Sequence, residues 1–165
     1  MKAILRLILL ALVAGLGIWL WTVLFPGPEK VIRRRLLELA RAASTAPNES
    51  DLMRLAAARS VAGYFATNVE FNVDSPRFSK HDTMDREGIA QAVLVARSRP
   101  GGFRVNFPDV DVTVARDRQS AAVDLTVEVN LPGERDPVLQ EMKFTLCRVD
   151  GQWLITRVET VRTLS

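Results

Sequence analysis

The chain has little of the chemistry from which most metal and redox sites are built. Its 165 residues include one cysteine, Cys147, one histidine, His81, and one tyrosine, Tyr64. A single cysteine excludes an intrachain disulfide, and one cysteine with one histidine cannot supply the usual ligands of a zinc site. We therefore expect no metal and no cofactor.

An excess of charge of one sign is also missing. The formal net charge is +3, and residues 1–28 contribute two basic side chains, Lys2 and Arg6, and no acidic ones. The rest of the chain then carries 20 basic against 19 acidic side chains. A nearly neutral domain argues against nucleic acid as a partner.

One long apolar segment is present near the N-terminus. Residues 7–25 carry no charge, follow Lys2 and Arg6, and end at the sequence Pro26-Gly27-Pro28. At about 1.5 Å per residue, such a helix spans roughly the 30 Å of a bilayer core. The segment is therefore predicted to cross a membrane.

Aromatic residues distinguish an anchor from a cleaved signal peptide. Trp19 and Trp21 lie where an interfacial aromatic belt is expected, and where a cleavage site needs small residues. We therefore predict an uncleaved signal-anchor in residues 1–27, with residues 4–25 in the lipid bilayer and one domain in residues 28–165.

Basic residues after the anchor leave its orientation open. Lys30, Arg33, Arg34, Arg35 and Arg41 favour a cytoplasmic domain if they are simply counted. The short basic leader before the apolar run instead resembles an export signal, which predicts a single-pass protein of a bacterial inner membrane with a periplasmic domain. The first four of these residues either contact anionic headgroups, at about 1 kcal/mol each, or form a solvated helix face.

The remaining pattern predicts an α+β domain with helices first and a sheet last. Apolar residues recur at helical spacing after Pro28, again after Ser50, and from about residue 84 to 96. Residues 103–163 read as strands, and residues 121–131 alternate between apolar and polar almost without interruption. One apolar sheet face must be covered, so we expect three helices packed on a mostly antiparallel sheet.

Shorter signals divide these elements. The second helix is expected to bury Leu52 and Leu55. Residues 69–73 suggest a short strand and residues 74–82 a polar loop, and Pro108 marks a bulge or an edge because proline cannot donate to a ladder.

The order of elements carries a resemblance. Two helices, the second ending in Tyr64-Phe65, precede Val69-Glu70-Phe71, a helix opening Asp85-Arg86-Glu87-Gly88-Ile89, and long strands that end in Asp150-Gly151-Gln152-Trp153-Leu154-Ile155. Over residues 29–163 this resembles the nuclear transport factor 2-like superfamily, also known for its SnoaL-like and cystatin-like cone domains. The resemblance implies a strongly curved sheet that wraps around helices and leaves a pocket at the open end. Members include isomerases, dehydratases, cyclases, subunits of secretion machines and binding modules.

Catalytic residues match that resemblance poorly. An isomerase-type site in the superfamily needs a carboxylate base near the end of the first strand, and Asp74 is in that approximate place. Tyr64 is the remaining weak candidate, although we favour a structural role for both residues, Asp74 as a turn residue at the end of a strand and Tyr64 as a core tyrosine. Asp111 and Asp124 alternate with apolar residues and so face away from the pocket. His81, flanked by charges, is expected on the surface.

A hairpin at Asp150-Gly151 decides the lining of the pocket. With a two-residue turn, Phe144 opposes Arg157 and Met142 opposes Glu159, so the charged pair shares the inner face. With a three-residue loop the pair faces outward. We favour the first register. It predicts a ligand pocket lined by Arg157, Glu159, Trp153, Phe144 and Phe107.

These observations favour a membrane-anchored, non-catalytic binding or assembly module with a cone-shaped pocket. The alternatives are a small isomerase, dehydratase or cyclase acting in the same pocket, or a component of a secretion or envelope assembly. Its partner is an unidentified small ligand or protein. A homodimer through the outer sheet face is also open, and would be lined by Asp124, Thr126, Glu128, Glu141, Lys143 and Thr145.

Overall fold

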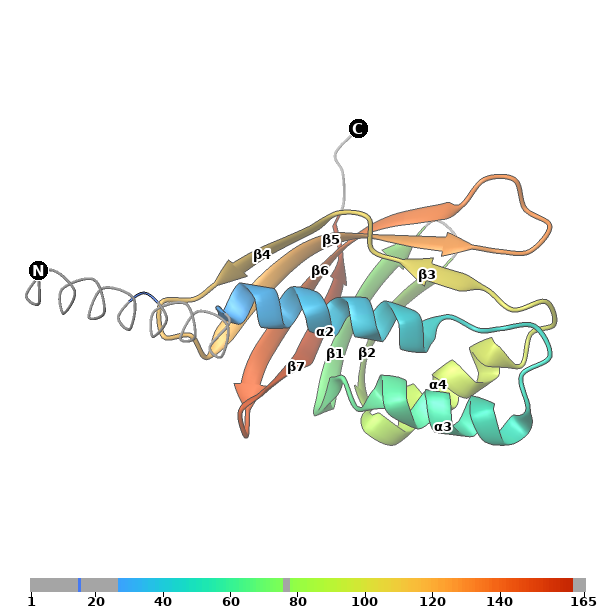
Figure 1. Ribbon diagram of the computed structural model, residues 1–165, viewed down its shortest axis with the longest axis horizontal. Coiled ribbons are helices and arrows are strands. Elements are labelled where there is room, and N and C mark those ends of the chain that lie inside the picture. The colour runs from blue at the N-terminus through green and yellow to red at the C-terminus, as the bar shows by residue number, and fades with distance from the viewer. Residues whose placement is uncertain (1–14, 16–26, 76–77, 162–165) are drawn as a thin grey trace, which may run out of the picture.

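A computed structural model describes residues 15, 27–75 and 78–161 and shows three helices against a curved sheet (Figure 1). The helices are α2 (Pro28–Ala43), α3 (Asp51–Ala62) and α4 (Arg86–Arg97). The strands are β1 (Phe65–Ser75), β2 (Phe78–Asp85), β3 (Arg104–Asn106), β4 (Val110–Val114), β5 (Ser120–Asn130), β6 (Val138–Val149) and β7 (Gln152–Thr160). The α+β class and the three helices were predicted, and both are confirmed.

Each helix begins at a local signal. Pro28 opens α2, where its fixed φ angle is suited to a first helical position and its missing N–H costs nothing. The Ser50 side chain accepts a hydrogen bond from Met53 N and caps α3, and Asp85 does the same for Gly88 N at α4. In α3 the predicted apolar stripe is partly wrong, because Leu52 and Leu55 are 79% and 38% exposed.

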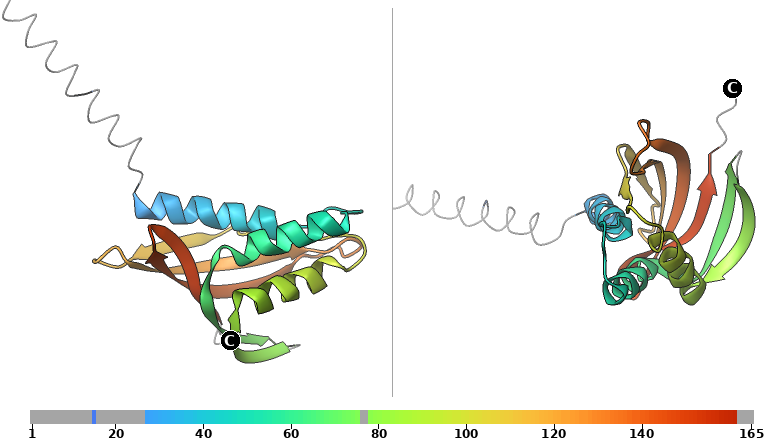
Figure 2. Two further views of the ribbon diagram at one scale, coloured as in Figure 1. Left: turned by 90° about the horizontal axis from the view of Figure 1, so that it is seen from below. Right: turned by 90° about the vertical axis from the view of Figure 1, so that its right-hand side faces the viewer.

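The sheet has the strand order β2-β1-β7-β6-β5-β3. Strand β3 pairs with the end of β5, and β4 pairs with its first half. The β1–β7 pair is parallel and the others are antiparallel. Pro108 lies between β3 and β4, which both pair with β5, as its missing N–H predicts. The sheet curves around the three helices (Figure 2).

The core fills the space between helices and sheet. The alternation predicted for residues 121–131 is confirmed in the first half of β5, where Ala121, Val123 and Leu125 are buried while Asp124 is exposed; residues 126–130 are all half-buried. The sheet contributes further buried apolar side chains, and α2 covers them with Ile32 and Leu36. The interior of the cone is therefore largely occupied by apolar side chains, most prominently Phe65, Val69, Phe144, Leu146, Trp153, Ile155 and Val158.

The loop predicted at residues 74–82 is wrong. Residues 78–85 form β2, which pairs antiparallel with β1 from Ser75↔Phe78 to Asn68↔Asp85. The segment lacks apolar alternation because β2 is an edge strand with much of its surface in solvent. Its strand conformation comes from hydrogen bonds to β1, which no local pattern records.

Among the described residues, no helix has the length and apolar character needed to span a bilayer. The anchor predicted in residues 1–27 falls almost wholly outside the described residues.

Candidate functional site

The β6–β7 hairpin contains a bulge that moves two predicted site residues to the other face. The turn is the predicted two-residue one, with Val149 opposite Gln152 and Leu146 opposite Ile155. The register then shifts by one residue at Thr156, whose hydroxyl donates to Thr145 O at 3.1 Å. Because side chains alternate along a strand, a shift of one residue exchanges the two faces beyond it.

Arg157 and Glu159 consequently do not share the inner face, and that prediction is wrong. Arg157 lies opposite Thr145 and forms an ion pair with Glu70 at 2.6 Å, with both side chains about half exposed. Glu159 lies opposite Lys143. Val158, between them, is buried instead.

The other predicted pocket residues belong to the core or its border. Trp153 and Phe144 are 3% and 6% exposed and pack in the main cluster. Phe107 is partly buried, with its ring edge-on to Phe144 at 6.4 Å between centroids. Whether any of the predicted residues binds a ligand stays a prediction.

The two weak catalytic candidates lie at opposite ends of β1. Tyr64 precedes the strand and its ring lies 5.0 Å below the Arg35 guanidinium. Asp74 is near the other end, ten residues on, which is about 30 Å at the usual rise of a strand. The pair cannot act on one small substrate.

Asp74 instead lies near His81. His81 Nε2 is 3.6 Å from Asp74 Oδ1, and His81 Nδ1 is 3.4 Å from Asn72 Oδ1. Asn72 lies opposite His81 on β2 and beside Glu159 on β7, so the group belongs to the outer sheet face. The His81 side chain is 61% exposed. The contact joins an acid to an imidazole on an exposed part of the surface.

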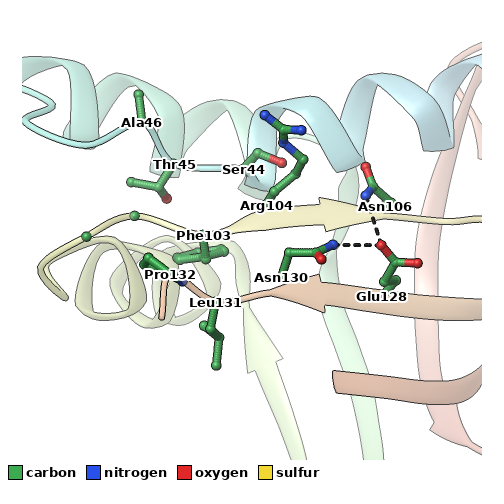
Figure 3. A pocket seen from close by; sticks show the side chains of 12 residues that line it. Ser44, Thr45, Ala46, Phe103, Arg104, Asn106, Glu128, Asn130, Leu131 and Pro132 are labelled. Carbon is green, nitrogen blue, oxygen red and sulfur yellow. Dashed lines mark hydrogen bonds between the residues drawn. The ribbon is translucent and has the colours of Figure 1, made fainter. Parts of the chain in front are cut away.

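A hollow does exist along the seam between the second half of α2 and β3. One end, of about 420 Å³, is lined by Leu37, Ala40, Arg41, Ser44, Arg104, Val105, Asn106, Phe107 and Pro108. The other, of about 760 Å³, is lined by Ser44, Thr45, Ala46, Gly101, Gly102, Phe103, Arg104, Asn106, Glu128, Asn130, Leu131 and Pro132. Three residues, Ser44, Arg104 and Asn106, line both ends, so we treat them as one site and call it the seam groove. Figure 3 shows the larger end.

Two hydrogen bonds along the groove, one to a side chain and one between backbone groups, close the free edge of β3. Val105 N donates to Ser44 Oγ at 2.9 Å, and Thr45 N donates to Phe103 O at 2.8 Å. Since the edge is already bonded, a partner cannot add a strand there. The groups that the groove offers to solvent are therefore mainly side chains.

Amide side chains line the larger end. Asn106 Nδ2 and Asn130 Nδ2 both donate to Glu128 Oε1, at 3.3 Å and 2.6 Å (Figure 3). The Glu128 carboxylate thereby fixes both amides. Thr45 Oγ1, also in this wall, is buried and has no hydrogen-bond partner among the described residues. This end offers polar groups for a ligand.

Two arginines supply the positive charge of the groove. Arg41 reaches it from α2, and Arg104 extends from β3 toward α2 beside Ser44 (Figure 3). Neither guanidinium has a hydrogen bond or ion pair within the described parts of the chain. Guanidinium groups that lie free over a hollow are available to an anion.

A buried arginine holds the wall of the groove in place. Arg97 is 4% exposed, donates to the carbonyls of Ala42 and Ala43, and binds both oxygens of Glu49 at 2.7 and 3.2 Å. It joins the end of α4 to the end of α2, directly before Ser44. Sequence reasoning missed it, because the only local signal was a basic residue in the last turn of a helix.

Gly102 lets the opposite wall approach. Its φ angle is +72°, and a Cβ atom there would lie 2.6 Å from Thr45 O. The pair Gly101-Gly102 is the only sequence signal for this position, and it does not identify the backbone that Gly102 approaches.

The basic residues predicted to face a membrane differ in their surroundings. Arg35 contacts Tyr64, and Arg33 donates to Val110 O, so both bind the domain itself. Arg34 is exposed and paired with Glu38, and Lys30 is exposed. Lys30, Arg34 and Arg41 form a line at helical spacing along the exposed side of α2.

No group of three or more histidine, cysteine, aspartate or glutamate side chains in the described ranges could hold a metal.

Comparison with known proteins identifies the fold. No protein-family model matches the chain, and no curated protein does. Solved structures match over most of its length. A nuclear transport factor 2-like protein with a cystatin-like fold from Novosphingobium aromaticivorans is 17% identical, with a TM-score of 0.60 over 90% of this chain and 86% of that one.

Two further structures agree. A proposed scytalone dehydratase from N. aromaticivorans DSM 12444 is 16% identical, with a TM-score of 0.58 over 82% of this chain and 84% of the other. A domain of unknown function with a cystatin-like fold from Nostoc punctiforme PCC 73102 is 19% identical, with a TM-score of 0.60 over 86% and 80%. At such identities the likeness establishes the nuclear transport factor 2-like fold and no activity.

Proposed function

We propose that this protein is a non-catalytic binding module, held at a membrane by residues 1–27, which binds its ligand in the seam groove. The observation that carries the proposal is the pair of unpaired guanidinium groups, Arg41 and Arg104, over a hollow of ligand size. The resemblance suggested a site inside the cone. The core side chains that occupy the cone favour a site outside it.

Catalysis has weaker support. The superfamily resemblance would need a base and a hydrogen-bond donor that converge, whereas Asp74 and Tyr64 are separated by the length of β1. The contact between Asp74 and His81 is the one observation that favours an enzyme. If it were a catalytic pair, Asp74→Asn would abolish turnover of any substrate while leaving ligand binding intact.

Native mass spectrometry of the full chain, released from nanodiscs, tests binding in the groove. Asn106→Trp fills the groove at an exposed strand position, and Thr113→Trp places the same side chain at an exposed position of β4. We expect a bound mass on the parent and on Thr113→Trp that is absent from Asn106→Trp. A bound mass that survives Asn106→Trp contradicts the proposal.

The side of the membrane is part of the same proposal. We place the domain on the exported face of a bacterial inner membrane, supported by the short basic leader before the apolar run. A protease added to spheroplasts should then digest the domain, whereas protection until lysis would mean a cytoplasmic domain.

A further inference from the structure

The smaller end of the seam groove combines positive charge with apolar surface. Arg41 and Arg104 lie on it, and no described residue in its lining is acidic. Leu37, Phe107 and Pro108 line the same space, and Leu37 is 51% exposed although it lies on a helix whose other face is buried in the core. Cations next to apolar surface match a molecule with an anionic head and a hydrocarbon part.

The distribution of charge along the groove determines which end of the groove the anionic head would occupy. Glu128, the one acid in the lining, belongs to the larger end and already accepts from two amides. An anionic head is therefore repelled from that end and attracted to the arginines, where each guanidinium can donate two parallel hydrogen bonds to an oxyanion. The hydrocarbon part then lies against Leu37, Phe107 and Pro108.

Rigid supports hold the backbone of the two elements that carry these arginines. Arg41 lies in the last turn of α2, whose end is held by Arg97. Arg104 lies on β3, which is bonded to β5 on one side and to Ser44 on the other. A site on fixed elements loses less conformational entropy on binding than one on loops.

We propose that the seam groove binds an amphiphile with an oxyanion head, a carboxylate or a phosphate ester, on Arg41 and Arg104. The inference rests on the proposed binding function of the groove and adds the chemical class of its ligand. A lipid of the surrounding bilayer and a free medium-chain acid share this chemistry, so the test separates the two sources.

Photolabelling of the full chain in neutral phosphatidylcholine nanodiscs tests the inference. The probe is an octanoate that carries a diazirine, with its uncharged amide as the matched probe, and labelled peptides are identified by mass spectrometry. We expect the acid, and not the amide, to label peptides that contain Leu37 or Phe107. Loss of charge-assisted hydrogen bonds in Arg41→Gln/Arg104→Gln should lower this labelling about tenfold or more.

A control variant carries the same change of charge elsewhere. Arg116→Gln/Arg148→Gln removes two exposed arginines at the other end of the sheet, one in the turn between β4 and β5 and one near the end of β6, and should leave labelling unchanged. Competition identifies the source: displacement by phosphatidylglycerol in the nanodisc supports a lipid, and displacement by unlabelled octanoate but not by phosphatidylglycerol supports a soluble acid.

Two outcomes would overturn different statements. Equal labelling of the groove by acid and amide, or labelling that persists in Arg41→Gln/Arg104→Gln, refutes the ligand class and leaves the groove as a binding site. Acid-selective labelling of peptides around Phe144 and Trp153, with none at Leu37 or Phe107, would instead return the site to the interior of the cone and refute the proposed function.

Discussion

Two ion pairs of nearly equal length lie in different surroundings. Arg97 and Glu49 are 2.7 Å apart with side chains 3% and 13% exposed, whereas Arg157 and Glu70 are 2.6 Å apart and 45% and 53% exposed. Water solvates the charges of the second pair in both the folded and the unfolded chain, so this pair contributes little to the free energy of unfolding. Removing Arg97 from the first pair leaves the Glu49 carboxylate and the carbonyls of Ala42 and Ala43 without this donor.

We expect Arg97→Ala to lower the free energy of unfolding by about 3–5 kcal/mol, because Glu49 stays buried without a partner. Thermal unfolding followed by circular dichroism should show a fall in Tm of about 10 °C. Arg157→Ala is the matched control, and its exposed pair should cost about 1 kcal/mol or less. Equal losses in the two variants would contradict the structural role of Arg97.

Gly102 provides a second test at this scale. Gly102→Ala introduces a Cβ 2.6 Å from a backbone oxygen as well as strain at a positive φ angle, and we expect a loss of about 2–3 kcal/mol. Gly133→Ala shares the positive φ, at +88°, but nothing lies within 4 Å of the new Cβ. That control should cost about 1 kcal/mol. Equal losses of stability in the two variants would show that the close approach of Gly102 to Thr45 is not the reason that this position needs glycine.

Among the elements, β7 shows how one extra residue determines the character of a face. Before Thr156, Trp153 and Ile155 point inward, and after it Val158 does. Without the bulge the strand would bury Arg157 and Glu159 and expose Val158. The bulge therefore keeps the apolar face continuous over a sequence whose simple alternation would break it.

Deleting Thr156 should be tolerated for that reason, because it removes the extra residue itself and leaves Val158 inward and Arg157 outward in a regular strand. We expect a loss of about 1 kcal/mol, since the hydrogen bond from the Thr156 hydroxyl to Thr145 O is removed, and no new apolar surface that binds a hydrophobic dye. Deleting Glu134 shortens an exposed connection between β5 and β6 and should leave Tm within a few degrees. Loss of cooperative melting in the Thr156 deletion would mean that the bulge does more than keep the two faces in register.

At the scale of the whole molecule, the boundary between anchor and domain can be tested directly. We predict that deletion of residues 1–27 leaves a soluble, folded domain, since α2 begins at Pro28 and has its own contacts with the sheet. The full chain should resist carbonate extraction from membranes, and the deletion variant should appear in the supernatant with a cooperative melt. Aggregation without cooperative melting would refute the boundary.

The outer sheet face bears on the predicted homodimer. Asp111 lies directly opposite Asp124, Glu141 and Glu159 are on the neighbouring strands, and Lys143, between Asp124 and Glu159, is the one basic side chain beside these four acids. A symmetric dimer through this face would bring like charges together. We expect such a dimer to tighten between about 0.01 and 1 M salt, as the Debye length falls from about 30 to 3 Å. Sedimentation of the full chain in nanodiscs measures this, and weakening of a dimer by salt would point to another interface.

Asp111→Asn/Asp124→Asn provides the matched variant. Removal of the facing charges should tighten a dimer at low salt without affecting its affinity at high salt. Lack of any change at low salt would show that the dimer does not use this face.

Patterns within single segments were enough to establish most of the architecture. The three helices, the long strands β5 and β6, the break at Pro108 and the two-residue turn at Asp150-Gly151 follow from periodicity, caps and turn residues. These signals are local, because a helix or a hairpin turn is determined by residues within a few positions of one another. The nuclear transport factor 2-like fold could be inferred from their order.

Tertiary structure decided what the local patterns could not. Strand β2 exists through its pairing with β1, and the outward position of Arg157 depends on one bulge. The seam groove is lined both by Arg41 and by Arg104, which is 63 positions further along the chain. The ion pair between Arg97 and Glu49 likewise joins residues that are far apart in the sequence. Periodicity reports which face of an element is apolar, but not which partner that element meets. The groove could be seen only once α2 and β3 lay side by side.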